Sequence, residues 1–348
     1  MIKVEYSLLL EATKELLRKA GLDNFSVNAV SEGLCETSLR GVDSHGIKLL
    51  PHYIESAISG RKNPKPKFKW NNKYASLISL DADSAFGHAA GAKAVEIGIE
   101  QAEINGISAV AVKNSSHPGA LSCMTLAGAR AGFISIAFTH ADSLMLSHNG
   151  IRPFFGTNPM SISVPRIEKD PYCLDMATTM ISWNKLLNHR KNKEVLDENI
   201  AADEDGVFTT NPENATSLFP AGGYKGFGLA SMVEIFSSLY NGMSFGHDIL
   251  PMYKTSMSTK RYLGQFYVFL KIDGAISAEN FLLSVQSLTD QIRSEPNIGK
   301  SSVKMPNDPE IKNSVDRLKN GIPIEDDLYK SLQDLSLKFN INNSFFNQ

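Results

Sequence analysis

The segment ISAVAVKNSSHPGALSCMTLAGARAGFISIAFT, residues 107–139, decides the fold of this chain. It begins with an apolar run at Ile107–Val112 and ends with a second one at Phe133–Thr139. Between them lie a polar loop that contains His117 and a helix-like stretch over residues 120–131. Apolar strands that alternate with a helix indicate an α/β unit. His117 follows a strand end, where catalytic groups gather in such folds.

Length and composition limit the possible functions. A chain of 348 residues can bury a large core and should form two lobes, because single cores stop growing near roughly 250 to 300 residues. Its 35 basic and 37 acidic residues balance closely, which gives no electrostatic footprint for nucleic acid or an anionic membrane. We therefore expect the partner to be a small molecule or another subunit.

The cysteines and the apolar runs indicate a cytoplasmic protein. Cys35, Cys123 and Cys173 are far apart and show no metal-ligand spacing, so the sequence predicts neither a disulfide framework nor a metal site. Acidic Glu5 and Glu11 near the N-terminus argue against a secretory signal. No apolar run approaches the roughly 18 residues that a membrane span requires.

The N-terminal part of the chain reads as helical. Apolar residues recur at helical spacing over residues 4–17, and a second helix over 27–39 should be capped by Ser26. A third helix follows His45. The proline-rich and basic segment 60–67 suggests a solvated linker, so we expect the first domain boundary near residue 75.

Beyond residue 75, strands alternate with helices. The apolar patterns predict strands at 76–80, 107–112, 133–139, 160–164 and 265–272, and helices at 90–105, 229–240, 278–294, 308–320 and 326–339. Segment 184–210 is mostly polar and suggests a mobile surface excursion.

Several residues are candidates for chemistry. His45 lies between Ser44 and Gly46 at a junction of two helices, where Asp43 and Ser44 could orient its ring; it could transfer a proton at neutral pH, or simply cap a helix. His117 is likewise a candidate for proton transfer or for a purely structural role. Asp175 ends an apolar run and could accept hydrogen bonds from a ribose, although capping of the next segment is the commoner role.

Two further segments could bind an anionic cofactor. The turn Gly156-Thr157-Asn158-Pro159 favours free backbone N–H groups. The glycine-rich run at 222–228 precedes a helix, and a helix N-terminus attracts anions, with Lys225 adding a full charge. Neither G-x-G-x-x-G after a strand nor a P-loop occurs, which argues against an ordinary Rossmann or P-loop nucleotide site.

Seven motifs, in the order in which the family has them, resemble the type-2 malate/L-lactate dehydrogenase family. Their residues are most similar to those of its ureidoglycolate dehydrogenase branch. They cover nearly the whole chain: Arg40-Gly-Val-Asp-Ser-His-Gly46 with Pro51 and Tyr53, Ser116-His-Pro-Gly-Ala120, Ala131-Gly-Phe-Ile134, Phe155-Gly-Thr-Asn-Pro159, Asp175-Met-Ala-Thr178, Asp205-Gly206 with Thr210-Asn-Pro212, and Gly222-Gly-Tyr-Lys-Gly-Phe-Gly-Leu229.

The resemblance implies an α/β (α+β) protein that differs from a Rossmann fold. A central domain, residues 76–254, would carry a largely antiparallel mixed sheet and bind NAD or NADP. A helical domain would combine residues 1–75 and 255–348. The family implies a homodimer and reversible hydride transfer between nicotinamide and C2 of a small 2-hydroxy or 2-oxo acid.

The resemblance also assigns roles to residues. His45 would exchange the substrate proton, with His117 as the second candidate, and Ser44, Lys48 and Tyr53 would complete the catalytic group. The residues expected to hold the cofactor are Gly156, Thr157, Asn158, Pro159, Asp175, Met176, Ala177, Lys225, Gly226, Asn307 and Asp308.

Some positions depart from the family pattern. Leu49 stands where the family usually has an arginine that could clamp a substrate carboxylate, and the adjacent Lys48 would project about 100 degrees away on a helix. Asn307 replaces a usual glycine, and Asn184 stands where a glycine is common. These changes leave open a cyclic imine reductase, or a catalytically impaired member that acts as a binding protein.

Overall fold

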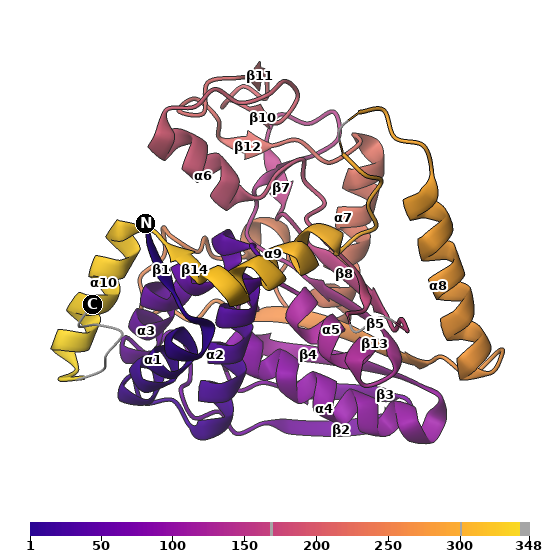
Figure 1. Ribbon diagram of the computed structural model, residues 1–348. Coiled ribbons are helices and arrows are strands. Elements are labelled where there is room, and N and C mark those ends of the chain that lie inside the picture. The colour runs from indigo at the N-terminus through magenta and orange to yellow at the C-terminus, as the bar shows by residue number, and fades with distance from the viewer. Residues whose placement is uncertain (168–169, 300, 342–348) are drawn as a thin grey trace.

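The computed structural model describes residues 1–167, 170–299 and 301–341. Its centre is a seven-stranded mixed sheet flanked by helices (Figure 1). In spatial order the strands are β2 (Lys69–Tyr74), β3 (Leu77–Asp81), β4 (Ile107–Ser115), β13 (Leu263–Lys271), β5 (Phe133–Thr139), β8 (Met160–Val164) and β9 (Tyr172–Met176). β3 and β4 run parallel, and the other neighbours in this sheet pair antiparallel.

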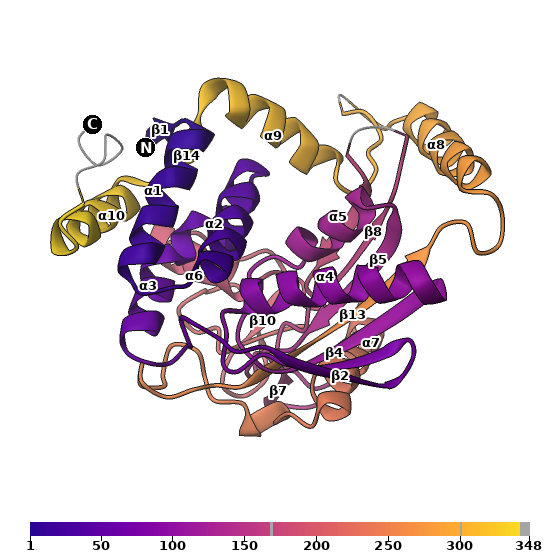
Figure 2. The ribbon, with the colours of Figure 1, turned by 90° about the horizontal axis from the view of Figure 1, so that it is seen from below.

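Helices cover both faces of this sheet. α4 (Gly87–Asn105) and α5 (Ser122–Arg130) pack on one face, and α7 (Tyr224–Ser237) packs on the other (Figure 2). Strand β13 alternates accordingly: Tyr267 joins the core beneath α4, whereas Phe266 joins the cluster beneath α7. This period of two is what a strand buried on both faces requires.

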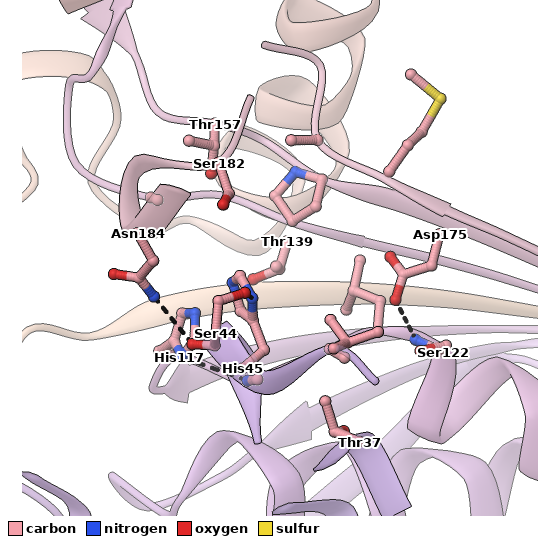
Figure 3. A pocket seen from close by; sticks show the side chains of 18 of the residues that line it. Thr37, Ser44, His45, His117, Ser122, Thr139, Thr157, Asp175, Ser182 and Asn184 are labelled. Atoms are coloured by element: carbon pink, nitrogen blue, oxygen red, sulfur yellow. Dashed lines mark hydrogen bonds between the residues drawn. The ribbon is translucent and has the colours of Figure 1, made fainter. Parts of the chain in front are cut away.

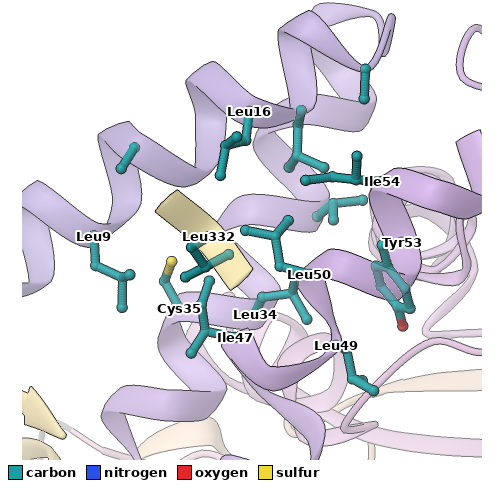
Figure 4. Packing of buried hydrophobic residues seen from close by; sticks show 14 of the residues in the cluster. Leu9, Leu16, Leu34, Cys35, Ile47, Leu49, Leu50, Tyr53, Ile54 and Leu332 are labelled. Carbon is teal, nitrogen blue, oxygen red and sulfur yellow. The ribbon is translucent and has the colours of Figure 1, made fainter. Parts of the chain in front are cut away.

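A helical unit stands beside the sheet and contains both ends of the described chain. It comprises α1 (Tyr6–Lys19), α2 (Asn24–Leu39), α3 (Leu50–Ile58), α9 (Asp308–Asn320) and α10 (Asp326–Lys338), with β1 (Ile2–Val4) paired to β14 (Ile322–Ile324). Leu332 of α10 packs among Leu9, Leu16 and Leu34 in one apolar core (Figure 4). Segments from the two ends of the sequence therefore depend on each other for burial.

The junction between α2 and α3 holds two short 3-10 helices, η1 (Asp43–His45) and η2 (Ile47–Leu49). Two more, η3 (Leu239–Asn241) and η4 (Gly246–Asp248), follow α7. Helix α2 begins one turn earlier than expected: Asp23 is its N-cap and accepts from the Ser26 backbone N–H at 2.8 Å. The prediction that Ser26 caps α2 was wrong, because Asp23 starts the helix one turn earlier and so places Ser26 inside its first turn.

Segment 184–210 is not a plain loop. It contributes most of α6 (Trp183–Asn192), with β10 (Ala201–Ala202) and β11 (Phe208–Thr209). Those strands join β12 (Ser217–Leu218), β6 (Met145–Leu146) and β7 (Pro153–Phe155) in a small second sheet. A local apolar cluster that includes Leu186, Leu196 and Leu218 holds these elements together. The segment predicted as a mobile surface excursion thus contains regular structure, since a few apolar residues suffice when a neighbouring segment covers them.

The segment 60–67 is also not a solvated linker throughout. Arg61 and Lys62 are only 4% and 3% exposed. Strand β2 follows directly and was not predicted, because its six residues are all exposed and lack an apolar pattern. Long-range pairing with β3, rather than local composition, makes it a strand.

The segment 255–348, assigned above to the helical domain, is divided in the structure. β13 lies in the middle of the large sheet, between β4 and β5. α8 (Ala278–Ser294) lies at the far side of the molecule from α1 and α10 (Figure 1). Within this segment, α9, β14 and α10 pack with the N-terminal elements. The apolar pattern predicted this strand, but its pairing with β4 and β5 cannot be predicted from local sequence.

None of the helices in the described part of the chain is long and apolar enough to cross a membrane.

Candidate active site

A cavity of about 610 Å³ lies between the helical unit and the large sheet. Its wall includes His45 and Leu49 from the α2–α3 junction, His117 after β4, and Asp175 at the end of β9. Figure 3 shows the two histidines together and Asp175 beside Ser122 some way along the same cavity. The volume falls within the range of small-molecule and cofactor sites.

His45 reaches the cavity because η1 turns the chain between α2 and α3. The Ser44 hydroxyl lies 2.9 Å from His45 Nδ1, and the Asn184 side-chain amide of α6 donates to the Ser44 carbonyl at 3.0 Å. Asp43 does not orient the ring, because it forms an ion pair with Arg317 of α9. Ser44 therefore remains as the predicted partner of His45.

Neighbouring groups position the His117 ring through its Nδ1 atom. Its Nδ1 lies 3.2 Å from the Tyr53 hydroxyl and accepts from the Gly119 backbone N–H at 3.3 Å. Gly119 has φ +71°, and a Cβ there would come within 2.5 Å of the His88 ring. Glycine is thus required for this close approach. Tyr53, 0% exposed, acts behind His117 rather than on the cavity wall.

The two rings form a pair. Their centroids are 5.8 Å apart and their planes are inclined by 28°. Burial lowers the pKa of His45, and burial followed by the charges of His45 and Lys62 holds the pKa of His117 well below its usual range. Both imidazoles are consequently neutral near pH 7, which is the form that can accept a proton.

The other part of the cavity offers a carboxylate. Asp175 Oδ2 accepts from the Ser122 backbone N–H at 2.8 Å. The side chain faces the cavity, and the surrounding protein desolvates the carboxylate and so raises the pKa of Asp175. Met176 and Ala177, next along the chain, also line the cavity.

Two of the four residues in the predicted turn at 156–159 line the cavity, and the other two do not. Thr157 and Pro159 line the cavity. Asn158 is 0% exposed and instead links the turn to α7, donating to the Ala230 carbonyl at 3.0 Å and to Glu234 at 2.7 Å. Gly156 is absent from the wall as well; a Cβ there would lie 2.5 Å from the Ala141 carbonyl oxygen.

The α9 loop contributes one of its two predicted residues. Asn307 lines the cavity with φ +81°, which explains why glycine suits this position. Its amide donates to the Pro171 carbonyl at 2.8 Å, and its carbonyl oxygen accepts from Arg40. Asp308 is not part of the cavity wall and pairs with Arg293 at 2.6 Å.

The structure does not bring the remaining predicted residues to the cavity wall. Lys225 is exposed and Gly226 is buried in the first turn of α7, which begins at Tyr224 rather than Leu229. Lys48 extends away to Asn188 of α6, with Nζ 3.1 Å from its amide oxygen, and to Glu325 at 3.7 Å.

His140 and Arg261 are among the residues of the wall that sequence reasoning missed. His140 follows β5 as His117 follows β4, so the strand-end signal was present; its Nε2 accepts from the Gly264 backbone N–H at 2.8 Å, and burial lowers its pKa to about 3. Arg261 precedes β13 and pairs with Asp142. Nothing local marks Arg261, because only the pairing of β13 with β4 and β5 brings it here.

Comparison with known proteins identifies the family. A family model described as malate/L-lactate dehydrogenase matches residues 4–333. The chain belongs to this family. It is 31% identical over 333 residues to the ureidoglycolate dehydrogenase (NAD(+)) of Escherichia coli K12, with 95% of each chain covered. It is 29% identical to the L-sulfolactate dehydrogenase of Methanocaldococcus jannaschii, with 94% of each covered.

Solved structures of relatives have the same fold. The malate dehydrogenase of Entamoeba histolytica superposes with a TM-score of 0.93 at 26% identity, covering 98% of this chain and 99% of that one. The sulfolactate dehydrogenase of Methanocaldococcus jannaschii gives 0.92 at 26% identity over both whole chains. A member of this dehydrogenase family is an oxidoreductase that requires a nicotinamide cofactor.

The cavity residues fit such a cofactor. The Asp175 carboxylate on the cavity wall suits a ribose hydroxyl, which needs an acceptor. Thr157, Met176 and Ala177 line the same region, and the lining as a whole is mostly apolar, as cofactor sites are.

Proposed function

We propose that this protein is an NAD(P)-dependent oxidoreductase that interconverts a small 2-hydroxy acid and its 2-oxo acid. The observation that carries the proposal is the pair of neutral histidines, 5.8 Å apart, on the wall of a cofactor-sized cavity that also presents Asp175. A bound nicotinamide supplies or accepts the hydride. The protein must then hold the substrate and move one proton.

His45 is the group we propose to exchange that proton. If its Nδ1–H donates to the Ser44 hydroxyl, Nε2 is left as a free base, since it has no hydrogen-bond partner among the described residues. His117 differs, because the Gly119 N–H donates to its Nδ1 and so favours the tautomer with hydrogen on Nε2. Neutral His117 can then donate a hydrogen bond to the substrate oxygen while His45 takes or returns the proton.

The substrate carboxylate requires a cation. Leu49 cannot supply it, and Lys48 is directed away from the cavity. Arg261 lines the cavity and lies close enough for its charge to lower the pKa of both His117 and His140. We propose Arg261 as the carboxylate partner, a role that suits its planar guanidinium.

The experiment is a screen of the purified protein for oxidation of NADH and NADPH with a panel of 2-oxo acids and cyclic imines. We expect turnover with a 2-oxo acid. Turnover only with cyclic imines would assign an imine reductase. Cofactor binding without turnover on any member of the panel would assign a catalytically impaired binding protein, and no cofactor binding would refute the oxidoreductase.

The acid/base assignment is tested by His45→Ala and His117→Ala. His45→Ala should lower kcat by about two to four orders of magnitude with cofactor affinity unchanged. Retained turnover in His45→Ala together with loss in His117→Ala would transfer the role to His117.

We also propose a homodimer in a reducing cytoplasm. Apolar side chains on α7 and η3 remain substantially exposed, including Ile235 at 52% and Leu239 at 48%, more than a monomer surface usually gathers. The three cysteines are unpaired, which suits a reducing compartment. Light scattering after gel filtration would give the mass, and a monomer at micromolar concentration would contradict the dimer.

A further inference from the structure

A second, smaller cavity of about 20 Å³ lies behind His117. It shares His117, Met252, Arg261 and Leu263 with the large cavity, so the two spaces lie on either side of one part of the wall. Its volume admits a single particle the size of a water molecule or a small monatomic ion. The function proposed above makes no use of it.

The wall of the small cavity is rich in groups that carry or can carry positive charge. The basic residues that line it are His52, Arg61, Lys62, His117, Lys260 and Arg261, and the remaining lining includes Ser84 and Ser115. None of the lining residues carries a carboxylate. The nearby acid Asp142 is already engaged, because it pairs with Arg261 and accepts from the Met252 N–H at 3.3 Å.

Lys62 brings a buried amino group to this cavity, and burial together with the charges of Arg261 and Arg61 holds its pKa well below the usual range. The residue is 3% exposed, and Nζ has no hydrogen-bond partner among the described residues. It lies 3.6 Å from the centre of the Tyr53 ring and 4.8 Å from that of Phe86. The faces of these rings attract a cation, but they compensate only part of the cost of removing its charge from water.

Arg61 brings a second donor without a partner. Its two terminal nitrogens donate to backbone carbonyls, at 2.9 Å to Met252 and 2.8 Å to Ser256, so the guanidinium is fixed in place. Its Nε is buried and has no partner among the described residues. A guanidinium does not lose its proton in proteins, so this N–H requires an acceptor. Arg61 lines the small cavity, which therefore offers room for that acceptor.

We propose that the small cavity binds one monovalent anion of chloride size, held by Lys62 Nζ and Arg61 Nε. Water alone would supply an acceptor but no negative charge. An anion satisfies both donors and neutralises a wall that otherwise gathers cations without a free counter-charge. The proposal depends on the positions and charges of Lys62 and Arg61, and these do not depend on the substrate of the enzyme.

The site would also act on the catalytic histidine beside it. The titratable and charged groups that face His117 are His45, His88, Lys62, Arg261 and the Tyr53 hydroxyl, and burial together with those basic groups lowers the pKa of His117. An anion next to Lys62 would offset part of this effect. Chloride is therefore expected to raise the pKa of His117, a consequence that rests on the role proposed for His117 above.

The direct test uses bromide, which scatters X-rays anomalously. Crystals of the wild-type protein soaked in sodium bromide should show an anomalous peak within hydrogen-bonding distance of Lys62 Nζ and Arg61 Nε. Lys62→Met should lose the peak, while Lys65→Met, which removes an exposed lysine from the same segment, should keep it. A wild-type cavity without bromide would overturn the proposal in favour of water beside a neutral Lys62 amine.

A second readout does not require activity. At constant ionic strength, with gluconate as the replacement anion, chloride at tenfold excess over its Kd should raise Tm by about 2 °C. Lys62→Met should abolish this rise and Lys65→Met should retain it. An equal rise in all three proteins would refute the site. Both readouts remain valid even if the oxidoreductase screen fails.

Discussion

Replacing His88 with leucine should change how the stability of the protein depends on pH. His88 lies on α4 with 1% exposure, and both of its ring nitrogens lack hydrogen-bond partners among the described residues. Its ring packs closely, since a Cβ on Gly33 or Gly119 would come within 2.2 Å or 2.5 Å of it. Burial, followed by the charges of Lys62 and His45, lowers the pKa of His88 to about 3.

The sign follows from proton binding. In the unfolded chain a histidine protonates near pH 6.5, whereas folded His88 stays neutral down to about pH 3. The unfolded state therefore binds more protons as the pH falls below 6.5, and the free energy of unfolding decreases. Between about pH 7.5 and 5.5 each such histidine removes about 1.4 kcal/mol. His140, also with a pKa of about 3, adds a similar amount.

The assay is equilibrium unfolding in urea at a series of pH values. The wild-type protein should lose about 3 kcal/mol over this interval from His88 and His140 alone, and His88→Leu should lose about 1.4 kcal/mol less than the wild type. His148→Leu is the matched control, because His148 is exposed and solvated in both states. If His88→Leu and the wild type show the same pH dependence, the buried neutral histidine is not the cause.

Three other substitutions test the site. Tyr53→Phe removes a hydroxyl 3.2 Å from His117 Nδ1 and should lower kcat/KM about tenfold in steady-state assays, with no effect if that hydroxyl does not position the ring. Asp175→Ala should weaken NADH binding, measured by fluorescence titration, by about 10- to 100-fold through loss of a charged hydrogen bond, and an unchanged Kd would remove Asp175 from the cofactor site. Asn307→Gly keeps the backbone conformation but leaves the buried Arg40 without that acceptor; a loss of about 2–3 kcal/mol in urea unfolding is expected, and equal stability would show that the hydrogen bond contributes nothing.

The chain's local patterns predicted the elements that carry the site. Apolar periodicity gave β4, β5, β8 and α9 nearly at their observed bounds, because each is long enough to show its own repeat. Short strands such as β6 and β12 were not predicted, since two residues are too few to show an alternating apolar pattern. The exposed edge strand β2 was not predicted because its pairing with β3, and not its composition, makes it a strand.

The candidate site was predicted in part. Both histidines that the motifs singled out line the cavity, and so do Asp175 and Asn307. Lys225 was predicted from a helix N-terminus, but a charge near a helix start does not determine where that helix points. His140 was not among the predicted site residues, because one sequence gives no measure of which strand end faces a cavity.

By itself, the sequence determined the α/β class, the family and the identity of the groups available for proton transfer, because these depend on residue types and short spacings. Only the tertiary structure decided that Arg261 shares a cavity with His117 and that Lys62, in a segment of basic and proline residues, is buried behind it. Burial and neighbourhood depend on which distant strands pair and which surfaces they cover. No local pattern along the chain records that choice.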